Sequence, residues 1–174
     1  MAFTAKHNIT TALSQDLISA GDNAGAIKSI NLANVHIISS VSVDLIIYKS
    51  SSQHYIIKNV VIPSGTSLVI DMSEIPINTS LNQDSLRIKL TKGATFTLTG
   101  SIDPAASTTV TGVSTLFLTE ISIGDEIVVS SETRTVTAIA SDTSLEVSVA
   151  FSDNSNDTAP DCNPTAIVDV IINT

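Results

Sequence analysis

Val41-Ser42-Val43-Asp44-Leu45-Ile46-Ile47 is the stretch that most clearly decides the fold, because large apolar residues recur at every second position. Successive side chains of a β-strand point to opposite faces, so the apolar residues at the odd positions share one face and are expected to be buried together. Ile46 falls on the opposite face and is outward, as is Ile56 in the next strand; if exposed, these residues would form apolar patches that are unusual for a monomer.

The same two-residue period recurs along the chain at intervals of roughly 8–12 residues, with turn residues between the runs. The clearest repeat is Leu86-Arg87-Ile88-Lys89-Leu90, in which the two cations face solvent. A short helix is a second possibility for residues 13–20. Further strands are predicted at Asn8–Leu13, Ala26–Leu32, His54–Ile62, Ser67–Ile70 and Ala94–Leu98.

The composition agrees with an all-β protein. The 174 residues include 15 Val, 23 Ile and 21 Thr, so about a third of the chain is β-branched and suited to a pleated surface. Only 14% of residues are charged, which leaves Ser, Thr and Asn to cover the surface. We therefore predict an antiparallel β-sandwich of the jelly-roll or immunoglobulin-like type.

The texture of the sequence changes after residue 98, where bulky Ile runs give way to Thr, Ser and small apolar residues. Bulky alternation returns only at Thr165–Ile172. A lone terminal strand cannot bury its apolar face, so we expect this strand to return to the first domain. The predicted domains are a sandwich of residues 1–98 plus 163–174 and an inserted small β-barrel-like module of residues 99–162.

The insertion contains short runs that together resemble a β-rich module of tail- and fibre-associated proteins of tailed bacteriophages. They are Ser107–Gly112, Phe117, Gly124–Ile127, Arg134–Ile139 and Asp142–Leu145. The remainder is similar to small virion structural proteins of tailed phages, including cyanophages, through Ile57–Gly65 and the apolar strand that follows. The resemblance implies a virion component and carries no catalytic residues.

The charge balance restricts the partners. Eight basic residues against 17 acidic ones give a net charge of -9, and the cations are scattered, so we expect neither nucleic acid nor membranes as partners. No charged and apolar leader opens the sequence, which predicts synthesis in the host cytoplasm. The single cysteine, Cys162, excludes a disulfide within the chain; we expect a loop thiol whose pKa its acidic neighbours raise.

Candidate chemistry is sparse. His7, His36 and His54 lie in separate segments without metal-ligand spacing, so no metal or other cofactor is predicted. Gly124-Asp125-Glu126 is interpreted as a tight turn into a strand, with an acidic ligand pair as the alternative. Gly112 and Gly124 are both expected at chain reversals that need a positive φ.

Two sets of acidic residues could form a functional site, one a calcium site and the other a pair of catalytic carboxylates. Asp153, Ser155 and Asp157 match the first half of a calcium loop, but Thr158 and Pro164 replace its defining Gly and Glu. We therefore interpret this segment as a solvated linker loop, with a looser calcium site shared with Asp161 as the alternative. Carboxylates for glycoside hydrolysis are present as Glu120, Asp125, Glu126 and Glu132. The chain has no Trp and two Tyr, whereas sugar-cleaving clefts generally use aromatic platforms. We therefore predict no enzyme and no catalytic residues.

The remaining function class is assembly. We expect a structural protein of a tailed-phage particle that forms homo-oligomers and packs against capsid, neck or tail subunits as a cement or decoration component. Sheet edges and apolar patches would make the contacts. The alternative is a tail-fibre or adhesin-type protein that recognises the host surface through the inserted module.

Overall fold

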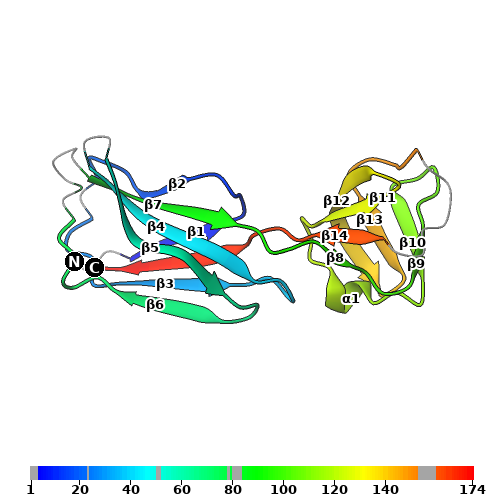
Figure 1. The fold of residues 1–174 in the computed structure, drawn as a ribbon, viewed down its shortest axis with the longest axis horizontal. Coiled ribbons are helices and arrows are strands. Elements are labelled where there is room, and N and C mark those ends of the chain that lie inside the picture. Colours follow the sequence, from blue (N-terminus) through cyan, green and yellow to red (C-terminus); the bar gives the residue numbers. More distant parts are fainter. Residues whose placement is uncertain (1–3, 23, 50–51, 78, 80–83, 153–159) are drawn as a thin grey trace. The chain divides into compact units, whose positions relative to one another are not determined.

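The computed structural model describes residues 4–22, 24–49, 52–77, 79, 84–152 and 160–174. These residues form fifteen strands and one helical turn, which confirms the all-β prediction (Figure 1). The chain divides into two compact units. The first, called the sandwich, comprises residues 1–36, 40–92 and 166–174; the second, called the inserted module, comprises residues 37–39 and 93–165.

The sandwich has two four-stranded antiparallel sheets, ordered β1-β15-β3-β6 and β2-β7-β4-β5. The pairing is nested: β1 pairs with β15, β2 with β7, β3 with β6 and β4 with β5. A long hairpin rolled into two sheets gives this order, which is that of a jelly roll. The strands are β1 (Thr4–Ile9), β2 (Gln15–Ile18), β3 (Ser29–Asn34), β4 (Val41–Lys49), β5 (Ser52–Ile62), β6 (Ser67–Asp71), β7 (Asp84–Thr91) and β15 (Val168–Asn173).

The last strand returns to the sandwich as predicted. β15 lies between β1 and β3 in Figure 1, and it pairs with both over its whole length. Val168, Val170 and Ile172 alternate into the interior and are fully or almost fully buried. The strand therefore completes both the hydrogen bonding and the core of its sheet.

A single apolar core lies between the two sheets and draws its residues from both. The odd positions of β4 face it, and Val43 and Leu45 are completely buried. Burying such a side chain contributes about 1.5–3 kcal/mol. The alternation in the sequence therefore identifies the inner faces correctly.

The N-terminal predictions need correction. The first strand is Thr4–Ile9 instead of residues 8–13, because β1 pairs with β15 only as far as Ile9 and Leu13 is 76% exposed. The helix considered for residues 13–20 is a strand, β2, which pairs with β7. Leu17 and Ile18 are both buried there, since the register shifts between Asp16 and Ile18. Tertiary pairing overrides the local preference.

The inserted module is one seven-stranded antiparallel sheet ordered β8-β14-β11-β12-β13-β10-β9. Its two outermost strands, β8 and β9, are joined by only Leu98–Gly100, so the sheet curls back on itself in a barrel-like manner. Phe117, in the helical turn α1 (Phe117–Glu120), is fully buried in its core. The strands are β8 (Phe96–Thr97), β9 (Ser101–Asp103), β10 (Thr109–Val113), β11 (Glu126–Val129), β12 (Glu132–Ser141), β13 (Ser144–Val147) and β14 (Asp161–Asn163).

The units change over at Lys92/Gly93 and Thr165/Ala166, whereas the sequence predicts changes near residues 98 and 163. The difference has a clear cause. β8 pairs with β14, so Phe96 and Thr97 belong to the module although their alternation resembles that of the sandwich strands. Only the register of these short strands identifies their sheet.

Gly112 is not at a chain reversal, contrary to our expectation. It lies within β10, is buried, and is absent from the residues with positive φ. A Cβ at this position would overlap the Thr115 side chain and lie 2.9 Å from Cζ of Phe117. Glycine is required here because the turn that follows packs directly on the strand.

Substituting Gly112 by alanine should therefore destabilise the module by about 1–3 kcal/mol, the usual cost of overpacking. Hydrogen exchange of the β10 and β13 amides measures this effect within the module. Thr111→Ala, in the same strand but exposed, is the matched control and should change exchange much less. Equal exchange rates in the two variants would contradict the packing explanation.

Candidate functional site

The outer face of the sheet β2-β7-β4-β5 contains both tyrosines of the chain and one of its two arginines. The register aligns Asp16, Arg87, Ile46 and Tyr55 in one row across the four strands. Tyr48 and Gln53 pair in a neighbouring row. These residues point away from the core because the positions between them, such as Leu45 and Ile88, are completely buried.

Ile46 is on this outer face, as predicted, but it is not exposed: only 2% of its surface is accessible. Its cross-strand neighbours Arg87 and Tyr55 have long side chains that account for the burial. Ile56 is also not an exposed outward residue, since it is partly buried against the core. Ile46 is therefore buried and Ile56 partly buried, so the condition for an exposed apolar patch at these two residues is not met.

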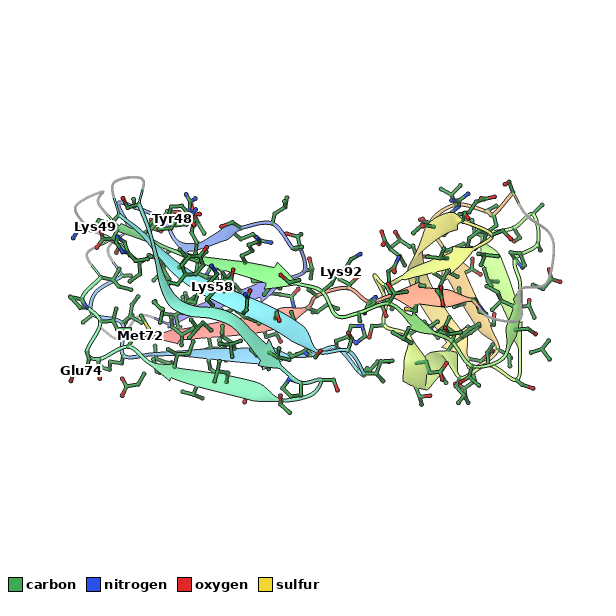
Figure 2. All side chains as sticks on the ribbon, in the orientation of Figure 1. Tyr48, Lys49, Lys58, Met72, Glu74 and Lys92 are labelled. Carbon is green, nitrogen blue, oxygen red and sulfur yellow. The ribbon has the colours of Figure 1, made fainter. Side chains whose placement is uncertain are left out.

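Cations stack on both tyrosines. The Arg87 guanidinium carbon lies 4.2 Å from the centre of the Tyr48 ring, and Nζ of Lys58 lies 4.6 Å from that of Tyr55. Both separations are within the range of cation–π attraction. Figure 2 labels Tyr48 and Lys58 on β4 and β5.

Polar contacts hold this arrangement in place. Nε2 of Gln53 donates a hydrogen bond of 2.6 Å to the Tyr48 hydroxyl, and the Tyr55 hydroxyl donates one of 3.3 Å to Oε1 of Gln53. One amide thus joins the two aromatic side chains. Asp16 forms an ion pair with Arg87 from the adjacent strand. We call Asp16, Tyr48, Gln53, Tyr55, Lys58 and Arg87 the Tyr–Arg face.

The Tyr–Arg face concentrates residue types that dominate protein interfaces. The chain has two Tyr, two Arg and no Trp, and both tyrosines and one arginine lie here. Tyr and Arg carry much of the binding energy in typical interfaces, and fixed side chains lose less entropy on binding. Its contacts suit recognition of another macromolecular surface, and none of them activates a nucleophile.

A neighbouring feature protects the edge of this sheet. β5 is an edge strand, and its pairing with β4 is irregular around Asn59, whose φ is 52°. The Asn59 amide donates a hydrogen bond of 2.7 Å to Oδ1 of Asp44. Bulges and lysines on an edge hinder the addition of further strands, so the face is better suited to contacts than this edge.

The structure does not bring the three histidines together. His7 is in β1 and half-buried, His36 is buried after β3, and His54 is exposed on β5. Among the described residues, no three His, Cys, Asp or Glu side chains are grouped so that they could hold a metal ion.

Cys162 is in a buried strand, not in a loop. It lies in β14, where it pairs with Ile127 of β11. It is fully buried, because the alternation of the strand directs its side chain into the module core. Burial raises the pKa of the Cys162 thiol, and the charge of Asp125 raises it further. The predicted direction is confirmed, but the sequence neighbours are not the main cause.

Gly124-Asp125-Glu126 forms the predicted turn, with Gly124 at φ 97°. Asp125 is completely buried, and its carboxylate accepts hydrogen bonds from the amides of Ser122 at 2.8 Å and Thr165 at 2.7 Å. The first bond closes the turn. The second fixes the chain one residue before it re-enters the sandwich at Ala166.

The other carboxylates considered for catalysis also support the backbone or its neighbours. Glu120 accepts hydrogen bonds from the Thr99 amide and hydroxyl at 2.9 and 2.5 Å. Glu132 pairs with Arg134 and accepts a bond of 3.1 Å from the Ser152 amide. The residues of the calcium hypothesis, 153, 155 and 157, lie outside the described residues, and Asp161 accepts a bond of 2.9 Å from the Thr97 hydroxyl.

Comparison with known proteins finds no matching family model, no matching curated protein and no matching solved structure. The only helix among the described residues is the four-residue α1, and no described helix has the length and apolar content needed to cross a membrane.

Replacing Asp125 by alanine should destabilise the module by about 1–3 kcal/mol, because two partly buried amides lose the buried carboxylate that accepts their hydrogen bonds. Urea denaturation followed by circular dichroism measures the loss. Glu146→Ala is the matched control, since Glu146 is only partly buried and accepts a bond from the exposed Thr109 hydroxyl. An equal shift of the urea midpoint in both variants would contradict a stabilising role for the hydrogen bonds that Asp125 accepts.

Cys162 should resist iodoacetamide in the folded protein and react only after unfolding. Its raised pKa keeps the thiol protonated in the folded protein. The difference from the pKa of the unfolded chain contributes to the free energy of unfolding, and this contribution is fully present at neutral pH. The contribution is lost as the pH rises above the ordinary thiol pKa of about 8.5. Mass spectrometry of alkylated samples at pH 7 and pH 9, with and without urea, checks this. Rapid labelling of the folded chain at pH 7 would contradict it.

Proposed function

We propose that the chain is a non-enzymatic structural protein of a tailed-phage virion, and that it acts by packing against other copies and against capsid, neck or tail subunits. The observation that carries the proposal is the Tyr–Arg face. It presents aromatic and cationic side chains whose positions are fixed before any partner binds.

The fold supports this proposal by analogy. Jelly rolls recur in viral capsid proteins, although they also occur in lectins and cupins, and a fold alone does not determine function. The sequence resemblance to phage structural proteins narrows the analogy to the virion. The accessory roles that fit are cementing or decorating a particle.

The energetics favour packing through a sheet face. Tyr55 is exposed and Tyr48 and Arg87 are partly exposed. Tyrosine and arginine side chains can each contribute about 2 kcal/mol or more, the level of a binding hot spot, when a partner excludes water from them. The Gln53 bridge and the two stacked cations reduce the entropy lost on binding. Such a face can cement subunits without any covalent step.

The alternative function, recognition of the host surface by the inserted module, requires exposed aromatic or polar contacts there. The module has no Tyr or Trp, and Phe117 and Phe151 are buried while Phe96 is partly buried against the core. Both tyrosines lie on the sandwich, which favours the packing role.

Mass spectrometry of purified phage particles should detect the chain in stoichiometric amounts, because an accessory structural protein remains bound through purification. The isolated protein should bind particles that lack it, and should not bind host cells or their glycans. A chain that is absent from particles would contradict the proposal. Retention of the isolated chain by host cells would favour the adhesin alternative.

A further inference from the structure

The charge of the chain is divided unequally between its two units. The sandwich has seven basic and seven acidic residues, so its formal net charge is zero. The module has one basic residue, Arg134, against ten acidic residues, so it holds the entire net charge of -9. The ten are Asp103, Glu120, Asp125, Glu126, Glu132, Asp142, Glu146, Asp153, Asp157 and Asp161.

The single cation of the module is already engaged. Arg134 pairs with Glu132 and stacks on Phe151 at 5.2 Å. Several carboxylates alternate with buried positions and so lie on the outer side of the curled sheet. Glu126 and Asp161 precede the buried Ile127 and Cys162, and Glu146 follows the buried Leu145.

The outer sheet of the sandwich presents the complementary sign. Lys58, Arg87 and Lys89 come from β5 and β7, and Lys58 and Lys89 are exposed. The two acidic residues on the same face, Asp16 and Asp44, are directed to Arg87 and to the Asn59 amide. Asp44 also lies across from Lys89, so three cations against two carboxylates give this face a net charge of +1.

We propose that the Tyr–Arg face of one copy binds the acidic module of a second copy, head to tail. This inference rests on the proposed function and names the first partner of that surface. Two modules repel each other because each has the same large charge, and two lysine-bearing faces repel each other as well. Contact between a face and a module is the arrangement in which opposite charges meet.

A head-to-tail contact uses two different surfaces, so it repeats from copy to copy until a ring closes or a filament forms. The attraction between exposed charges is screened within a Debye length of about 8 Å at physiological salt. Assembly should therefore weaken as salt is added, while the cation–aromatic contacts keep the orientation specific.

Sedimentation velocity of the full chain at low and high salt tests the proposal. The wild-type protein should form oligomers at low salt and dissociate progressively at high salt. Lys58→Glu should raise the dissociation constant by about tenfold, the effect of losing one favourable charge contact and adding a repulsive one. Lys28→Glu is the matched control, because it makes the same charge change at an exposed position outside the face, and it should have little effect.

A charge exchange completes the test. Lys58→Glu/Lys89→Glu protein, mixed with protein that has Glu126→Lys/Glu146→Lys in its module, should form mixed oligomers that neither variant forms alone. Circular dichroism establishes that each variant is folded. Equal weakening by Lys58→Glu and Lys28→Glu, or absence of mixed oligomers, would overturn the proposal.

The experiment separates this inference from the proposed function. If the isolated chain stays monomeric at low salt but binds particles, and Lys58→Glu abolishes that binding, the face docks on another virion subunit. The head-to-tail proposal then fails and the structural function stands. If the chain neither self-associates nor binds particles, both fail.

Discussion

The pairing of β15 with both β1 and β3 is the interaction on which the rest of the structure depends. Without this strand β1 loses its partner, and the sheet loses three core residues, Val168, Val170 and Ile172. The chain reaches β15 only after it has passed through the whole module. Asp125 fixes Thr165 at the end of that path, so one buried carboxylate in the module holds the segment from which the sandwich resumes.

The Tyr–Arg face lies on the other sheet of the sandwich. In the sheet β2-β7-β4-β5 the inner positions are committed to the core, and the outer positions carry Tyr48, Tyr55 and Arg87. The module has no Tyr and only one Arg but holds the net charge of the chain. The two units thus have distinct physical properties, an ordered aromatic and cationic face and an acidic module, and together these properties form the basis of the proposed assembly.

The sequence predicts the features that depend on alternation: the strands, the inner face of β4 and the return of Thr165–Ile172 to the sandwich. It does not predict what depends on register. Ile46 is outward as expected but covered, because only the pairing of β4 with β5 and β7 places Tyr55 and Arg87 beside it. Cys162 resembles a loop residue between two prolines, yet its pairing with Ile127 buries it. The two-residue spacing of Ile46 and Tyr48 and the alternation of Arg87 with Ile88 do place Tyr48 and Arg87 on outer faces. That four strands bring these side chains together follows only from the topology.

Cross-linking with a carbodiimide tests the central claim most directly, because this reagent joins a lysine to a carboxylate only where the two are in contact. A mixture of ¹⁴N- and ¹⁵N-labelled chains distinguishes links between copies from links within one copy. The account predicts mixed-isotope links that join Lys58 or Lys89 of one copy to peptides containing Glu126, Glu146 or Asp161 of another. Links between copies that involve only sandwich residues, or no mixed-isotope links at low salt, would contradict it.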